Sequence, residues 1–271
     1  MHESSEIFET TELNEGNKTL RELTSFFRDL IIILLFVLFI RMFLITPFQI
    51  NGSSMETSYH NGEYILVNKF SYLNLPVSYA SNESSDSFLI QAEKFILSRL
   101  PVHVGDPVRG DVVVITPHAD EKREYYIKRV IWLPGDTIKF ESGEVYIQKA
   151  SGSGEFIKLN EVYLSPSNKG NTRLDVDIHQ NIFQIPLGYY WVMGDNRNNS
   201  ADSRQCFQNC MGKSEPAHFI ARKDIIGTVL LDFGYFNIIE DGGLLKNGKM
   251  SWTHPPRLLN HPKNATYPEL N

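Results

Sequence analysis

The chain has 271 residues, of which 42% are hydrophobic and 12% aromatic. This composition can fill a sizeable core, so it excludes a chain that is disordered throughout. The net charge of −6 at pH 7 excludes the broad basic surface that nucleic-acid binding needs, so we expect no nucleic-acid partner.

Near the N-terminus, the stretch Leu30–Phe48 is apolar except at Arg41, Thr46 and Pro47. A helix needs ~20 apolar residues to cross a bilayer, so we predict a transmembrane anchor over residues 26–48. The alternatives are a buried helix of a soluble core and a removed signal peptide. The second is disfavoured by the long polar lead and by the lack of a small-residue cleavage site.

Basic residues predict the orientation of this anchor. Lys18, Arg21 and Arg28 precede the apolar stretch, whereas no Lys or Arg occurs in 49–67. By the positive-inside rule, residues 1–25 are expected in the cytoplasm and the rest of the chain across the membrane.

Beyond the anchor, short β-rich runs alternate with turn residues. The predicted strands are Tyr64–Val67, Asp111–Ile115, Tyr125–Trp132, Thr137–Phe140, Glu144–Gln148, Tyr189–Met193 and Gly227–Leu231. Only Asp86–Leu100 reads as an amphipathic helix. The sequence therefore predicts a mainly β fold, an antiparallel sheet or barrel-like domain behind one N-terminal transmembrane helix.

The expected organisation is a β-rich domain followed by a tail. The domain covers 49–244 and carries insertions at about 73–105, 140–185 and 205–216. Residues 245–271 form a polar C-terminal tail.

The first stretch that could carry chemistry is Asn51–Met55, which contains Ser53 and Ser54. A serine hydroxyl is a weak nucleophile until a base takes its proton, and most serines beside a glycine are solvated turn residues. The two serines should face opposite sides of an extended chain, so only one can meet a base.

The second stretch is Tyr126–Ile131, an apolar strand that contains Lys128 and Arg129. Alternate side chains face opposite sides, so Arg129 is expected on the wet side and Lys128 on the face of Tyr126 and Val130. Burial there lowers the pKa of an ammonium group, and a neutral lysine can act as a general base. The alternative is an edge-strand lysine whose head lies in solvent.

The third stretch, Met193–Arg204, is dense in short hydrogen-bonding side chains. Such side chains can hold a catalytic group in place, and Asp202 and Arg204 could form an ion pair that braces the loop. Composition alone does not separate this interpretation from a plain polar loop.

Together these segments resemble the bacterial type I signal peptidases, or leader peptidases, a family of Ser–Lys dyad serine proteases. The segments that carry the resemblance are, in chain order, Arg41–Phe43, Gly52–Met55, Gly62–Lys69, Arg109–Val114, Tyr126–Val130, Leu133–Asp136 and Gly194–Arg204. It covers roughly Phe26 to Leu231, without the segments at about 73–105 and 140–185.

The resemblance implies a role for each matching residue. Ser54 would be the nucleophile, and its backbone N–H would contribute to the oxyanion hole. Lys128 would be the general base, and Ser200 would hydrogen-bond and orient it. Asp202, Arg204 and Tyr126 would support the site. The resemblance implies neither a metal nor a cofactor.

The same resemblance implies the partners and the location. The substrate would be a secreted preprotein with small residues just before the cut, docked as an extended strand. The protein would be a single-pass protein of the bacterial inner membrane, with an apolar surface of the β domain resting on the bilayer. The alternatives are a catalytically inactive membrane-tethered homologue and a Ser–Lys autoprotease of the SOS-repressor type. The oligomeric state stays open.

Three features depart from the family pattern. Thr57 stands where many members have proline, which puts the local turn in question. Gly52 stands where some members supply a hydroxyl to the oxyanion hole. Cys206 and Cys210 lie in an insertion, where either two free thiols or a small-loop disulfide is expected.

Overall fold

The computed structural model describes the chain in two units, which are residues 1–44 and 45–271. The described residues are 3–72, 104–117, 125–150, 154–174, 180–208, 215–234, 236–237, 251–252, 254–258 and 267. The predicted helix Asp86–Leu100 and the cysteine Cys210 lie outside these residues.

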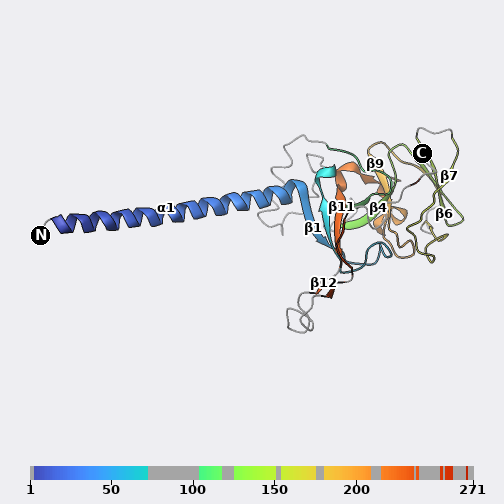
Figure 1. Ribbon diagram of the computed structural model, residues 1–271. Helices are drawn as coiled ribbons and strands as arrows, with labels where there is room; N and C mark the ends of the chain where they lie inside the picture. The colour runs from blue at the N-terminus through green and yellow to red at the C-terminus, as the bar shows by residue number, and fades with distance from the viewer. Residues whose placement is uncertain are drawn as a thin grey trace. The chain divides into compact units, whose positions relative to one another are not determined.

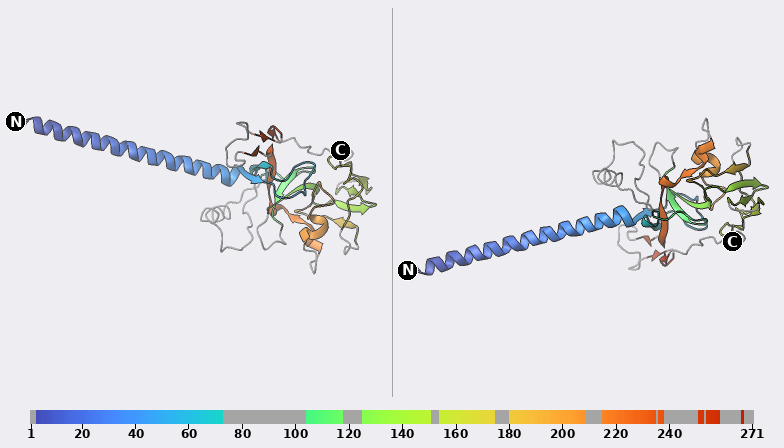
Figure 2. Two further views of the ribbon diagram at one scale, coloured as in Figure 1. Left: turned by 90° about the horizontal axis from the view of Figure 1, so that it is seen from below. Right: turned by 90° about the horizontal axis from the view of Figure 1, so that it is seen from above.

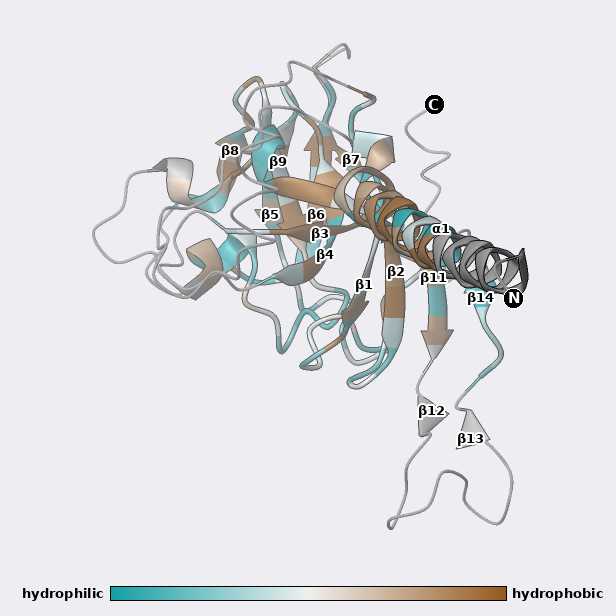
Figure 3. Cartoon of the chain, turned by 90° about the vertical axis from the view of Figure 1, so that its left-hand side faces the viewer, coloured by the Kyte–Doolittle hydropathy of each residue, from teal (hydrophilic) through white to brown (hydrophobic). Residues whose placement is uncertain are grey.

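The N-terminal unit is a long helix, α1 (Glu3–Phe39), followed by a π-helical turn, η1 (Ile40–Leu44). An 18-residue window within Leu20–Leu44 has a mean hydropathy of 2.4 and no buried side chain. Figure 3 shows the hydrophobic colour along this part of α1. A helix that is apolar on all sides and unburied is long enough, at about 1.5 Å per residue, to cross a bilayer.

The β-rich unit begins at Ile45, inside the range 26–48 predicted for the anchor. Residues Ile45–Gln49 form strand β1, which lies at the edge of a sheet. Pro47 is tolerated there because an edge strand does not need every backbone N–H for pairing. The apolar run of the sequence is therefore shared between a membrane helix and a sheet strand.

The main sheet has eight antiparallel strands in the order β1-β2-β11-β3-β4-β9-β10, with β14 paired to β11. Figure 1 labels β1, β11, β4 and β9 of this sheet, and Figure 2 shows the chain from two further sides. Its other strands are β2 (Tyr64–Asn68), β3 (Val112–Ile115), β4 (Tyr126–Trp132), β9 (Tyr189–Met193), β10 (Ile220–Ala221), β11 (Ile225–Gly234) and β14 (Arg257–Leu258). Register shifts in β4 and β11 mark local irregularities that bend these strands.

A second sheet of four strands has the order β7-β6-β5-β8. Its strands are β5 (Thr137–Glu141), β6 (Glu144–Gln148), β7 (Ile157–Lys158) and β8 (Ile182–Gln184). It occupies much of the range 140–185 that the sequence assigns to an insertion. The remaining elements are β12 (Phe236–Asn237), β13 (Ser251–Trp252), η2 (Phe70–Tyr72), η3 (Ser203–Gln208), η4 (Glu215–His218) and η5 (Arg222–Asp224).

The predicted mainly β fold behind one apolar helix is confirmed. All seven predicted strands are present, with ends that agree to within three residues. The strands that the sequence did not predict are β1, which reads as part of the membrane segment, and short strands of two or three residues. Two-residue strands leave no alternation for a sequence pattern to detect.

Separate apolar clusters support the two sheets. Under the 51–62 loop, which joins β1 to β2, a core cluster includes Met55, Tyr59, Ile65 and Val114. The four-stranded sheet packs around buried aromatic rings such as Trp132 and Trp191. Strand β4 contributes to both regions, so it links the second sheet to the loop that carries Ser54.

Candidate active site

Ser54 lies in the 51–62 loop, and this loop is closed at its base. Two backbone hydrogen bonds of 2.8 Å join the ends: Ile50 N donates to Glu63 O, and Gly62 N donates to Ile50 O. These bonds hold the loop as a compact excursion between two paired strands. The position of Ser54 is therefore fixed by the β1–β2 pair.

Neighbouring side chains decide which serine faces the lysine. Met55 is 1% exposed and packs into the core below the loop, which orients the adjacent residue Ser54. The Ser53 hydroxyl instead accepts a hydrogen bond of 2.8 Å from Asn199 Nδ2. The structure brings Ser54, and not Ser53, to Lys128.

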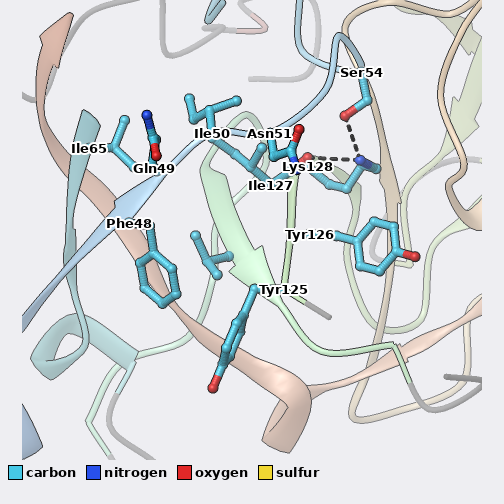
Figure 4. A pocket seen from close by; sticks show the side chains of 11 residues that line it. Phe48, Gln49, Ile50, Asn51, Ser54, Ile65, Tyr125, Tyr126, Ile127 and Lys128 are labelled. Atoms are coloured by element: carbon cyan, nitrogen blue, oxygen red, sulfur yellow. Dashed lines mark hydrogen bonds between the residues drawn. The ribbon is translucent and has the colours of Figure 1, made fainter. Parts of the chain in front are cut away.

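Lys128 comes from strand β4 and is 1% exposed. Its Nζ lies 2.8 Å from Ser54 Oγ and 2.9 Å from the carbonyl oxygen of Ile127 (Figure 4). Burial lowers the pKa of Lys128 to about 8, against the opposing effect of the Asp202 and Asp195 carboxylates. The lysine is buried, as the sequence predicts.

This pair has the geometry of a nucleophile and its base. A neutral amine 2.8 Å from a hydroxyl oxygen can accept the hydroxyl proton as the oxygen attacks an electrophile. At a pKa of about 8, a useful fraction of Lys128 is neutral near physiological pH.

Arg129 corrects one prediction from the sequence. It was expected on the wet side of β4, but it is fully buried. Its guanidinium donates to both carboxylate oxygens of Asp195, at 2.9 and 2.6 Å, and to Gly110 O at 2.8 Å. It also lies 4.1 Å from the centre of the Tyr163 ring. The second face of the strand is covered by protein rather than by solvent.

Asp202 and Arg204 form the expected ion pair at 2.8 Å, and both are buried. Burial raises the pKa of Asp202, but the charge and hydrogen bond of Arg204, together with the hydrogen bond from Gly194 and the nearby Ser200, lower it overall. Asp202 Oδ2 also accepts a hydrogen bond of 3.0 Å from Gly194 N. The pair therefore ties the start of the 194–204 loop to its end.

Ser200 is buried beside this pair, but the hydrogen bond to Lys128 that the resemblance implies is not formed. Its Oγ has no hydrogen-bond partner among the described residues, although it lies near enough to Asp202 to help lower that pKa. A Cβ at Gly194 would collide with Ser200 Oγ and with the carbonyl of Ser54. The glycine thus lets the 194–204 loop approach the serine closely.

Asp195 and Asn196 were not singled out from the sequence, yet they position the 51–62 loop. Asn196 N donates to Ser54 O at 3.0 Å, and its side chain donates to Ser53 O at 3.1 Å. Asp195 accepts a hydrogen bond of 2.5 Å from Ser58 Oγ. Both residues lie inside the motif-like stretch 194–204, which is the signal that could have identified them.

The backbone at Ser54 offers a free donor. Ser54 N donates to no acceptor in the part of the chain that the structure describes. Gly52 has a φ of +107°, its N–H donates to Asn61 Oδ1 at 2.8 Å, and a Cβ there would meet nothing within 4 Å. The space beside Gly52 is thus open, and the Ser54 N–H can stabilise a developing oxyanion.

The turn after Ser54 differs from one that contains proline. Thr57 has a φ of +72°, whereas proline fixes φ near −65°. Its Oγ1 donates to Tyr163 O at 3.2 Å, which helps to hold this uncommon conformation. Proline could not adopt the left-handed backbone conformation of Thr57, so the chain turns differently here from a chain with proline at this position.

A pocket of about 420 Å³ opens beside the pair and is lined by the end of β1 and the start of β4. Its lining residues are Phe48, Gln49, Ile50, Asn51, Ser54, Ile65, Val114, Tyr125, Tyr126, Ile127 and Lys128. Figure 4 shows Ser54 and Lys128 in the upper part of the view, and Phe48 and Tyr125 below. Tyr126 places its ring centre 5.3 Å from Lys128 Nζ. Polar and apolar side chains both line the pocket, and the reactive groups lie on its wall.

The insertion after the 194–204 loop contains a disulfide-bonded cysteine, Cys206. The other cysteine of the chain, Cys210, lies outside the described residues. Cys206 Sγ lies 3.3 Å from His218 Nε2, and the His218 ring stacks on Trp191 at 5.5 Å. This cysteine is thus packed against the core behind the site.

A comparison with protein families identifies the chain. The family model described as "Signal peptidase, peptidase S26" matches residues 23–233. The chain belongs to the S26 signal peptidase family. The resemblance drawn from the short motifs is therefore confirmed at the level of the family.

Individual S26 relatives are similar over different lengths. Signal peptidase I of Bacillus licheniformis is 32% identical over 232 residues, which cover 85% of this chain and 98% of that protein. Signal peptidase I of Pseudomonas aeruginosa is 36% identical over 191 residues, or 64% of this chain. The chain matches only 59% of the length of this second relative.

Among solved structures, a signal peptidase I from Enterococcus faecalis matches 45% of this chain and 95% of its own. The sequence identity is 27% and the TM-score is 0.30.

Proposed function

We propose that the protein is a membrane-anchored serine endopeptidase that removes N-terminal signal peptides from exported preproteins. The observation that carries this proposal is a buried amine 2.8 Å from a serine hydroxyl on the wall of a pocket. Membership of the S26 family and the apolar helix over Leu20–Leu44 support it. A catalytically inactive homologue would have no need of this arrangement.

In the proposed reaction, Ser54 Oγ attacks the carbonyl carbon of the scissile peptide bond while Lys128 Nζ takes its proton. The Ser54 N–H stabilises the negative charge on the carbonyl oxygen. The C–N bond then breaks, and Lys128 returns the proton to the leaving amine. Water attacks the resulting ester, with Lys128 again as the base, and releases the signal peptide and free Ser54.

The pocket suggests how the substrate binds. An extended peptide can lie between the end of β1 and the start of β4, with the residue before the cut inside the pocket. Ile50 and Ile127 are among the side chains that line it. We propose that small residues are accepted there.

We further propose that residues 1–25 lie in the cytoplasm and that the β-rich unit lies on the outer side of the inner membrane. The basic residues that precede the apolar helix support this orientation.

The test is cleavage of a purified preprotein by the detergent-solubilised full-length protein, with the new N-terminus of the product sequenced. We expect Ser54→Ala to lower the rate by about 10⁴-fold or more. Ser53→Ala is the matched control, because its hydroxyl bonds Asn199 and not the lysine. Equal activity in the wild-type and Ser54→Ala proteins would contradict the proposal.

A further inference from the structure

The base of the 51–62 loop carries a buried carboxylate, Glu63, which is 1% exposed. Its Oε2 accepts a hydrogen bond of 2.8 Å from His60 N, and its Oε1 lies 3.2 Å from His60 Nδ1. Its backbone oxygen closes the loop by accepting from Ile50 N. The orientation of Glu63 therefore governs the last turn of the loop that carries Ser54.

A second buried carboxylate faces this position from β11. Asp232 is 0% exposed, and its Oδ1 accepts a hydrogen bond of 2.8 Å from Gly234 N. Tyr59, the buried aromatic residue of the 51–62 loop, lies within its electrostatic range: burial first, and the Asp232 charge among others, raise the pKa of the Tyr59 phenol. Two carboxylates thus lie in the core between the loop and β11.

Two side chains of the C-terminal segment 254–258 face both carboxylates. The Arg257 guanidinium pairs with Asp232 through both Nε, at 3.1 Å, and Nη2, and its Nη2 lies 4.0 Å from Glu63 Oε2. His254 Nε2 lies 3.2 Å from Glu63 Oε1 and 3.5 Å from Asp232 Oδ2. A buried carboxylate destabilises the fold unless it is paired, so the contacts made by this segment offset the cost of burying Glu63 and Asp232.

Oxygen atoms face both ring nitrogens of His254. Its Nδ1 lies 2.8 Å from Pro255 O, and its Nε2 faces the two carboxylates among the described residues. The ring therefore joins the segment to Glu63 and Asp232 by polar contacts.

A metal ion is the other cation to consider, because one donor atom each of Glu63, Asp232 and His254 lie within 4.8 Å of one another. The Oδ2 atom of Asp232 that faces His254 is already occupied by the Arg257 guanidinium. A divalent ion there would meet a fixed positive charge, so the contacts favour an ionic cluster over a metal site.

We propose that segment 254–258 is a latch that positions the 51–62 loop, with His254 and Arg257 as positioning residues that act through Glu63 and Asp232. Strand β14 docks the latch by pairing Arg257 with Asp232 and Leu258 with Leu231. This inference rests on the proposed function, since the loop it positions carries Ser54.

The first test measures kcat and KM for preprotein cleavage by the full-length protein. We expect Arg257→Gln and His254→Gln each to lower kcat by about tenfold while KM changes less than about twofold, because a misplaced nucleophile slows the chemical step. Arg257→Lys should restore part of the loss by returning the charge. The matched control is Lys158→Gln, which breaks an exposed ion pair with Glu144 on the second sheet and should leave kcat unchanged.

The second test does not depend on peptidase activity. Amide hydrogen exchange is measured in the Ser54→Ala protein, with and without Arg257→Gln or His254→Gln. The latch predicts faster exchange at the N–H groups of Ile50, Gly62 and Glu63, which form the loop base, and unchanged exchange in β5 and β6. His254→Gln removes the contacts of His254 with the two carboxylates but keeps the ion pair of Arg257 with Asp232. This variant can therefore still test the latch if Arg257→Gln does not fold.

Unchanged exchange at the loop base in both variants would overturn the latch, even if activity fell. Stoichiometric binding of added Zn²⁺ that is lost in His254→Gln would also overturn it, because a metal would then replace the ionic cluster. Absence of cleavage by the wild-type protein, together with faster exchange in the variants, would refute the proposed function and leave the latch supported.

Discussion

The two faces of strand β4 each bury a cation, and their surroundings give the two cations opposite properties. Lys128 is 1% exposed and Arg129 is 0% exposed. Burial lowers the pKa of Lys128 to about 8. Burial also acts to lower the pKa of Arg129, but the carboxylate of Asp195 outweighs it and the pKa is raised. Equal burial thus produces an amine that can lose its proton and a guanidinium that cannot.

The difference lies in how the nearby carboxylates are used. Asp195 is held by Arg129, and Asp202 is held by Arg204. Among the described residues, the hydrogen-bonding partners of Lys128 are therefore both neutral: the Ser54 hydroxyl and a backbone carbonyl. Arg129 and Arg204 offset the negative charges of the two carboxylates, which would otherwise keep Lys128 charged. The ion pairs of these arginines therefore favour a neutral Lys128.

Replacement of Lys128 by the other type of cation, arginine, is expected to have the largest effect on preprotein cleavage. Lys128→Arg should lower preprotein cleavage by about 10⁴-fold, because a guanidinium stays protonated and cannot act as a base. Lys128→Met should be equally inactive but at least as stable as the wild type, since it removes the desolvation penalty of a buried amine. Cleavage rates and thermal unfolding in detergent would check this. Substantial activity in Lys128→Arg would show that the base lies elsewhere.

On the Arg129 face of β4, we expect removal of the partner carboxylate to lower the stability of the fold. Asp195→Asn leaves the Arg129 guanidinium buried without its counter-charge, which should cost about 3–5 kcal/mol. For a domain of this size, that corresponds to a fall of roughly 10 °C in Tm. The exposed pair of Lys158 and Glu144 provides the control, and Glu144→Gln should change Tm by less than about 2 °C. Equal shifts in both variants would show that Asp195 does not balance a buried charge.

Local patterns in the sequence were enough for the strands and for the Lys128 face of β4. Alternation with apolar neighbours predicted the burial of Lys128, and the structure confirms it. The same alternation placed Arg129 in solvent, which was wrong because residues from distant segments, Tyr163 and Asp195, cover that face. A sequence pattern reports which side chains share a face, but it does not report what covers the face.

Features that depend on long-range pairing could not be predicted. Strand β14 pairs with β11 from a tail that reads as polar. Tyr267 of the same tail is buried in the core cluster of the second sheet, with its hydroxyl 3.1 Å from that of Tyr163. Strand β1 was hidden because its apolar residues continue the membrane segment. In each case the decisive partner is remote in sequence, and no local periodicity encodes it.

The pH dependence of cleavage sharpens the comparison between the two cations. Only the neutral amine of Lys128 can accept the serine proton, so kcat/KM should fall about tenfold per unit as pH drops below a midpoint near 8. The unfolded chain binds this proton up to its ordinary pKa of 10.5, so Lys128 should make stability rise between about pH 8 and pH 10.5.

Arg204→Gln removes a charge that lowers the pKa of Lys128 and releases Asp202, whose charge raises that pKa. The midpoint in this variant should therefore move to higher pH, by about one unit. A midpoint that stays in place, measured for a variant that retains the wild-type fold by circular dichroism, would mean that the arginines do not set the charge of the lysine.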